Sequence, residues 1–330
     1  MEISRRDFIR KMTALGFTAA AAGAMFNWMS CSPAGNATTA PPEPSTSELP
    51  PPVTALTPPQ ISGTYLAVAR GTSPRAITEA AVKSLGGIEK FVKPGNDVII
   101  KPNICVAYHS YEYAATTNPE VVSTLVSLCK GAGARRVRVM DQPFGGTAEQ
   151  AYAISGIGDA VRAAGGQMET MSNVKFKNTP IAGGIDIQSW PIYQDVLDAD
   201  VVINVPIAKH HSLARLTLGM KNLMGVVLNR NLIHYNIGQK LADLSTVIKP
   251  SLTIVDCVRI LMNNGPTGGS LNDVKLTNTI IASQDVVVAD AYATTLFGLT
   301  GQDISYIRAA AQMGLGIMDP GSVKIEEINV

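Results

Sequence analysis

The chain has 330 residues, of which 46% are hydrophobic and 16% are charged, and its formal net charge is +1. This composition suffices for a large buried core, in one large domain or two moderate ones. The sequence has no basic stripe of the kind that binds nucleic acid, so we expect no nucleic-acid partner.

Residues 1–30 have the features of an export signal. Arg5 and Arg6 lie in "SRRDFIR", which resembles the twin-arginine motif, and an apolar stretch rich in Ala and Gly follows over 12–29. The stretch just reaches the length of a membrane span, so a retained anchor helix is the alternative. We expect the twin-arginine export machinery to recognise this segment and to export the protein to the periplasm or the cell surface.

Cys31 ends "WMSC", which resembles a lipoprotein box in which Trp28 is a mismatch. The sequence leaves open whether Cys31 is lipidated, which would anchor the protein to the membrane. Residues 31–60 are rich in Pro, Ser and Thr, a composition typical of a disordered spacer. We therefore expect the globular domain to cover 61–330.

From residue 64 the chain alternates strand-like and helix-like runs. Continuous apolar runs typical of buried parallel strands are followed by amphipathic runs, two of which start with Ser73-Pro74 and Asn118-Pro119. We predict strands at 64–71, 97–104, 135–142, 199–208, 251–261 and the start of 278–299. We predict helices at 73–87, 117–133, 147–166, 232–248, the end of 278–299 and 303–316.

This alternation predicts an α/β fold with an open, mostly parallel sheet and helices on both faces, either as one body or as two sub-domains around a cleft. Ligands of such sheets bind outside the carboxyl ends of the strands. Polar residues follow the apolar runs of several predicted strands, namely Lys101, Asn103, Asp141, Lys209, His210, His211 and Asp256. We therefore expect these residues to converge on one cleft.

Two adjacent histidines, His210 and His211, follow the strand at 199–208. Successive side chains of a strand point to opposite faces, so only one of the two can face the cleft. His211 leads into the segment that contains Lys221, which favours His211 and Lys221 as the catalytic pair. A histidine that only caps the strand end is the alternative.

Cations and amides near this segment predict an anion-binding site, because buried charges need partners or ligands that offset their desolvation. We expect five residues to bind a cofactor or another anionic group: Lys101, Asn103, Lys209, Arg215 and Asn222. For Lys101 and Asn103 an equal alternative is a plain strand end with a snorkelling lysine.

His211, His234 and Asp141 are candidate metal ligands, and a cap is the equal alternative for Asp141. The three downstream cysteines have separations that fit no zinc, iron–sulfur or disulfide pattern. We interpret Cys105, Cys129 and Cys257 as buried apolar thiols and expect no iron–sulfur cluster bound by this chain.

Six stretches together resemble the domain-of-unknown-function 362 family: "DVIIKPNI", "TTNPEVV", "GARRVRVMDQ", "ADVVINVPIAKHHSLARLTLGMKNLMGVV", "LTIVDC…GPTGG" and "VVVADAYA". They occur in this order and cover nearly all of 62–330. The resemblance implies no assigned activity. Some members of that family are fused to ferredoxin-type iron–sulfur modules, which implies redox work, and this chain has no such cysteine cluster.

A more distant resemblance is to the nickel-pincer lactate racemase family. It rests on His211 and Lys221, ten residues apart after a similar strand, with His234 downstream. The resemblance implies that His211 belongs to the catalytic pair, that Lys221 bonds covalently to the cofactor, and that His234 binds nickel. The chain departs from that family in two places: "DQPFGGT" after Asp141 lacks the second catalytic histidine, and "KPNI" replaces an Asp-x-Thr-Arg-Pro motif.

We therefore expect an exported enzyme, an oxidoreductase or an isomerase, that carries out redox chemistry or proton or hydride transfer on a small anionic substrate. It would depend on a metal, on a nickel-pincer-like group or on another redox cofactor. The alternative is a non-catalytic, membrane-tethered module that binds an anionic ligand in the same basic cleft.

Overall fold

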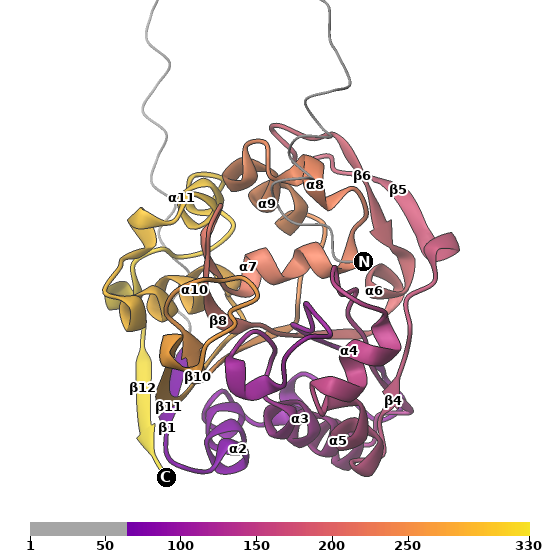
Figure 1. The fold of residues 1–330 in the computed structure, drawn as a ribbon, viewed down its shortest axis with the longest axis vertical. Coiled ribbons are helices and arrows are strands. Elements are labelled where there is room, and N and C mark those ends of the chain that lie inside the picture. The colour runs from indigo at the N-terminus through magenta and orange to yellow at the C-terminus, as the bar shows by residue number, and fades with distance from the viewer. Residues whose placement is uncertain (1–64) are drawn as a thin grey trace, which may run out of the picture. The chain divides into compact units, whose positions relative to one another are not determined.

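The computed structural model describes residues 65–330 (Figure 1). The predicted signal with Arg5 and Arg6, the lipidation site Cys31 and the spacer lie outside the described residues. The described residues form one compact unit, without a division into two sub-domains. Within 65–330, no helix is both long enough and apolar enough to cross a membrane.

The main sheet is open and mostly parallel, as the alternating pattern predicted. Along its width the strands are β12 (Ile325–Asn329), β1 (Leu66–Arg70), β11 (Val274–Ser283), β10 (Leu252–Leu261), β7 (Val201–Val205), β2 (Asp97–Pro102), β3 (Arg136–Val139) and β4 (Gln167–Met168). Of these strands, β11 runs antiparallel to its neighbours β1 and β10, and the other pairs are parallel. The central strands are buried on both faces, which explains their continuous apolar runs.

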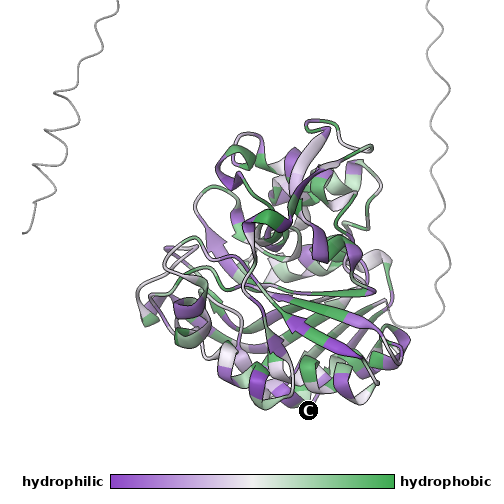
Figure 2. Ribbon diagram, turned by 90° about the vertical axis from the view of Figure 1, so that its right-hand side faces the viewer, coloured by the Kyte–Doolittle hydropathy of each residue, from purple (hydrophilic) through white to green (hydrophobic). Residues whose placement is uncertain are grey.

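Helices cover both faces of the sheet (Figures 1 and 2). Because strand side chains alternate between faces, Leu66 and Val68 enter one core and Ala67 and Ala69 enter the other. The core of Ala67 is covered by α2 (Pro74–Ser84), α3 (Pro119–Gly131), α4 (Ala148–Ile154) and α5 (Ile157–Ala163). The core of Leu66 is covered by α6 (Gln194–Asp198), α7 (Gly219–Asn222), α9 (Ile237–Ser245), α10 (Val286–Thr294) and α11 (Ser305–Gln312).

The predicted helix starts are found where the capping residues placed them. The side chain of Ser73 accepts a hydrogen bond from the backbone N–H of Ala76, and that of Asn118 accepts one from Glu120. The predicted helix at 147–166 is instead two helices, α4 and α5. Gly156, which separates them, has a φ of 75°, a conformation that interrupts the helical backbone.

The sequence analysis missed a two-stranded hairpin, β5 (Phe176–Pro180) with β6 (Ser189–Tyr193), and the edge strand β12. Most side chains of β5 and β12 are exposed or half-buried, so neither segment has the apolar run by which buried strands are recognised.

The predicted strand at 199–208 is two strands, β7 and β8 (Ile207–His211), which meet at Pro206. β8 pairs with β10 and forms a hairpin with β9 (Arg215–Thr217). This hairpin extends beyond the carboxyl end of β7 and carries the two adjacent histidines. It therefore brings them to the edge of the sheet at which β2 and β3 also end.

Candidate functional site

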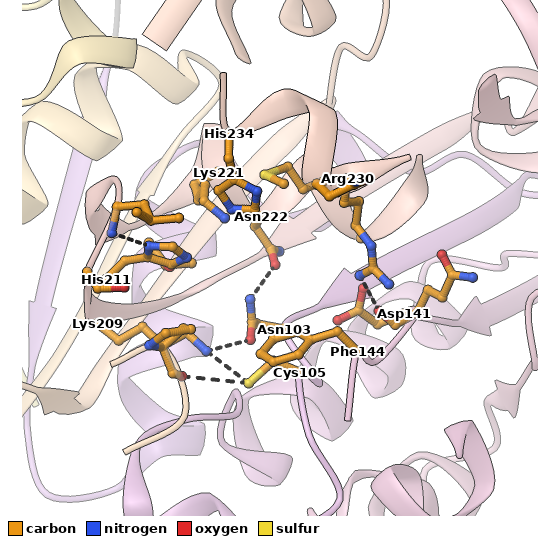
Figure 3. Close-up of a pocket in the computed structure, with 18 of the residues that line it drawn as sticks. Asn103, Cys105, Asp141, Phe144, Lys209, His211, Lys221, Asn222, Arg230 and His234 are labelled. Carbon is orange, nitrogen blue, oxygen red and sulfur yellow. Dashed lines mark hydrogen bonds between the residues drawn. The ribbon is translucent and has the colours of Figure 1, made fainter. Parts of the chain in front are cut away.

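A pocket with a volume of about 410 Å³ lies at the carboxyl ends of β2 and β3, beside β8 and α7. Its wall includes eight of the residues predicted from the sequence: Lys101, Asn103, Asp141, Lys209, His211, Lys221, Asn222 and His234. Figure 3 shows them with His211, Lys221 and His234 at one side and Asp141 at the other. Five of the strand-end residues thus converge as expected, whereas His210 and Asp256 do not line the pocket.

Lys101 is a buried cation whose hydrogen-bonding capacity is used within the protein. Its ammonium forms an ion pair of 2.8 Å with Asp141 Oδ1 and donates to Asn222 Oδ1 at 2.8 Å and to the Pro102 carbonyl at 3.0 Å. Burial lowers the pKa of Lys101, and Asp141 opposes this shift. Gly225 packs on the pair, and a Cβ at that position would lie 2.5 Å from Lys101 Nζ.

Lys209, on β8, is held in the same manner as Lys101. Its ammonium donates to Asn103 Oδ1 at 3.0 Å, to Cys105 Sγ at 3.2 Å and to the Ala115 carbonyl at 2.6 Å. The Asn103 amide in turn donates to Asn222 Oδ1 at 3.0 Å. Four of the predicted binding residues therefore form one internal network: Lys101, Asn103, Lys209 and Asn222. The two lysines of this network give the pocket positive charge, but their hydrogen bonds are used within the protein.

Lys221 lies in the same pocket without such partners. It is 8% exposed, and among residues 65–330 its ammonium has neither a hydrogen bond nor an ion pair. Burial lowers its pKa to about 7, and the positive charges of Lys209, Arg230 and Lys101 add to the shift. An amine with this pKa is partly neutral at physiological pH, as a general base or a nucleophile must be.

Helix α7 places Lys221, and a buried carboxylate fixes that helix. Asp290 accepts hydrogen bonds from the backbone N–H groups of Gly219 at 2.6 Å and Met220 at 2.9 Å. Burial raises the pKa of Asp290 to about 7, and these two donors oppose the shift. A Cβ at Gly219 would lie 2.7 Å from Asp290 Oδ1, so the approach requires glycine.

His211 is held by the turn of the β8–β9 hairpin. Its Nδ1 accepts hydrogen bonds from the backbone N–H groups of Leu213 at 3.1 Å and Ala214 at 3.2 Å. Burial lowers its pKa to about 3, with Lys221 the next cause. The imidazole is therefore neutral, and because Nδ1 is an acceptor its proton is assigned to Nε2.

The three predicted metal ligands do not form one ligand set. The rings of His211 and His234 are stacked with centroids 6.0 Å apart, and Asp141 is paired with Lys101. Within residues 65–330, no group of three or more His, Cys, Asp or Glu side chains is arranged to hold a metal ion. A histidine that binds a metal usually donates its other ring N–H to an acceptor, whereas Nδ1 of His211 accepts from N–H groups.

Arg215 was predicted to bind the cofactor, and the structure places it outside the pocket. Its φ of 62° turns the chain at the start of β9, and its guanidinium forms an ion pair with Asp303 at the surface. His210 points away from His211, as strand alternation requires, and its Nδ1 accepts from the Gly265 N–H. Asp256 accepts from the backbone N–H of Asn118 and serves as a cap.

Sequence reasoning missed several residues of the pocket. Arg230, from α8 (Arg230–Ile233), adds a cation and donates to the Gln142 carbonyl at 2.7 Å. Cys105 is buried, as expected, but its thiol also lines the pocket and accepts a hydrogen bond from Lys209. Its position after Asn103 at a strand end was an available signal. Cys129 and Cys257 are the expected core thiols, and burial raises the pKa of both.

The pocket as a whole is electropositive. Lys101, Lys209, Lys221 and Arg230 line it, and Asp141 is the acidic side chain of its wall. One carboxylate cannot balance four basic groups in a buried site, so an anionic ligand is favoured.

Two known proteins are similar to this chain. The thylakoid-associated protein sll1697 of Synechocystis sp. is 29% identical over 244 residues, which are 71% of this chain and 73% of that protein. The lactate racemase apoprotein of Thermoanaerobacterium thermosaccharolyticum matches with a TM-score of 0.44 and 13% identity, over 72% of this chain and 57% of that chain.

A family model also matches the chain, over residues 98–295. This region contains the strands β2, β3, β7 and β10 and the residues of the pocket described above. It covers more than half of the chain. The chain therefore belongs to the family described as domain of unknown function, DUF362.

Proposed function

We propose that this protein is an enzyme that binds a small anionic substrate in the pocket and transfers a proton through Lys221. The observation that carries the proposal is that the buried Lys221 has no partner within the described part of the chain, while Lys101 and Lys209 beside it have theirs. A buried amine without a partner is costly for folding, and such costs are typical of functional sites.

The substrate's anionic group would lie near the ammonium group of Lys209 and the guanidinium of Arg230, beside the amine of Lys221. The free amine of Lys221 would take a proton from the carbon next to the anionic group and later return it. The negative charge that develops on the substrate would be stabilised by these cations and by the Nε2–H of His211. A neutral imidazole can stabilise such a charge by donating a hydrogen bond. His211 is thus a donor in this proposal, in place of the acid–base role expected from the sequence.

The resemblance to nickel-pincer racemases also implies a cofactor bonded to a lysine with a histidine on nickel. Lys221 without a partner and His234 in the same wall are the residues that would hold such a group. When bound it would supply a hydride acceptor. The second catalytic histidine of that family has no counterpart here, because Gln142, Pro143 and Phe144 follow Asp141.

We also propose, from the sequence of residues 1–31, that the protein is exported by the twin-arginine route and that Cys31 is lipidated. The name of the Synechocystis relative describes that protein as thylakoid-associated, which supports a proposal that this chain also associates with a membrane. We infer that a lipid on Cys31 would provide the attachment.

The proposal is tested by hydrogen–deuterium exchange at the carbon next to the carboxylate of small 2-hydroxy acids, followed by NMR. Wild-type protein from its native host should catalyse the exchange, and Lys221→Met should lose it by about 10²- to 10⁴-fold. Lys83→Met, at an exposed helix position, is the matched control and should exchange like wild type.

Exchange that persists in Lys221→Met would contradict the role of this lysine. If wild-type protein binds these acids without any exchange, and carries neither a metal nor a chromophore, the non-catalytic binding module is the better description. Intact-mass analysis of peptides containing Lys221 tests the covalent cofactor separately, because an unmodified lysine in active native protein excludes it.

A further inference from the structure

The pocket changes from cationic to apolar between its depth and its mouth. Lys101 and Lys209 are each 1% exposed and Lys221 is 8% exposed, whereas Phe144 is 57% exposed and Leu213 is 65% exposed. All five side chains line the same pocket. A ligand that enters it therefore meets apolar groups first and buried positive charge last.

A further exposed apolar side chain adjoins this mouth. Tyr108 is 60% exposed and packs against Gly145, the residue after Phe144, where a Cβ would overlap its hydroxyl. We define the apolar rim as Tyr108, Phe144 and Leu213.

The described residues include eleven large apolar side chains that are exposed, and three of them form the rim of this one pocket. Scattered exposed apolar residues need no explanation, but a group of them around a pocket indicates a binding surface. A compact anion such as acetate could neutralise the deep lysines and would leave this surface in water.

We propose that the ligand of this pocket is an amphiphilic anion, with its charged head group beside Lys221 and its alkyl or aryl tail against Phe144 and Leu213. The inference rests on the proposed function, because it names the substrate class of that same site. The buried cations complement the head group, and the exposed side chains of the rim are covered when the tail binds.

The test is isothermal titration calorimetry of the full chain at pH 7 with acetate, butyrate, hexanoate and octanoate. Burial of each methylene should strengthen binding about fourfold until the tail extends beyond the rim. The n-alcohols of the same chain lengths are the matched neutral probes. They should bind at least about tenfold more weakly, because the buried cations do not attract them.

Variants separate the two halves of the site. Phe144→Ser with Leu213→Ser should remove most of the chain-length dependence, so that octanoate binds little more tightly than butyrate. Leu276→Ser, at another exposed leucine outside the pocket, should behave like wild type. Lys221→Met should weaken all of the acids by a similar factor and keep the chain-length dependence.

The failures are distinguishable. If acetate and octanoate bind equally well, the inference is wrong and the proposed function stands. If no acid binds and none exchanges deuterium, the proposed function fails as well. A flat chain-length series, together with sedimentation of the protein on anionic phospholipid vesicles that Phe144→Ser and Leu213→Ser abolish, would make the rim a membrane contact and overturn the inference.

Discussion

Lys101 and Lys221 line the same pocket and are held in different ways. Lys101 has three partners, Asp141, Asn222 and the Pro102 carbonyl, whereas Lys221 has none among residues 65–330. Both are buried, so both lose hydration, but only Lys101 regains interactions within the protein. The difference indicates that Lys101 supports the shape and charge of the site, while Lys221 is left for a ligand or for chemistry.

The largest expected effect is on stability at the Lys101 end. Lys101→Met leaves Asp141 buried without its partner and should lower the free energy of unfolding by about 3 to 5 kcal/mol. The double variant Lys101→Met with Asp141→Leu should recover most of this loss, because both charges are then removed. Urea denaturation measures the effect, and equal loss in the single and the double variant would show that packing, not the ion pair, is responsible.

The same substitution at the other lysine should have the opposite outcome. Lys221→Met removes a buried charge without a partner, so we expect the free energy of unfolding to be unchanged or to rise by about 1 kcal/mol. The same denaturation experiment provides the measurement. A loss as large as that of Lys101→Met would mean that Lys221 is held by interactions after all, and the comparison would fail.

The pKa of Lys221 predicts how both the stability of the fold and the rate of catalysis depend on pH. Burial lowers that pKa from 10.5 to about 7, so between pH 7 and 10.5 the unfolded chain binds more protons at this residue than the folded chain. The free energy of unfolding of wild type should therefore rise with pH in this window relative to Lys221→Met. Titration of unfolding in both proteins checks the sign.

Catalysis should follow the free amine. kcat/KM for exchange should fall about tenfold per pH unit below pH 7 and level off above it. His211, whose pKa burial lowers to about 3, should add no second titration in this range. A rate that is highest below pH 6 would mean that the ammonium form of Lys221 is the active one.

The smallest effect is expected at Arg215, which lies outside both ends of the pocket. Its ion pair with Asp303 is exposed, so Arg215→Ala should change the free energy of unfolding by less than about 1 kcal/mol. Binding of carboxylates, measured by calorimetry, should equal that of wild type. A tenfold loss of affinity in Arg215→Ala would show that Arg215 contributes to ligand binding after all.

Much of the fold could be predicted from sequence because its signals are local. Ser73-Pro74 and Asn118-Pro119 mark helix starts by their own hydrogen bonds, and continuous apolar runs mark strands buried on both faces. β5 and β12 were missed because their side chains are mostly exposed or half-buried. Gly156 divides a predicted helix through its backbone conformation, which sequence periodicity does not show.

The sequence by itself determined most of the residues that reach the pocket, because strand alternation and the carboxyl-end rule depend only on position along the chain, but it also included Arg215 and Asp256, which lie outside, and missed Arg230. It could not determine their roles. The acceptors around Lys101 and Lys209 come from segments that are distant in sequence. The Nε2 proton of His211 and the position of Arg215 depend on local backbone conformation. Only the tertiary structure decided which buried lysine has partners and which has none, since hydrogen bonding and desolvation depend on every group that surrounds a charge.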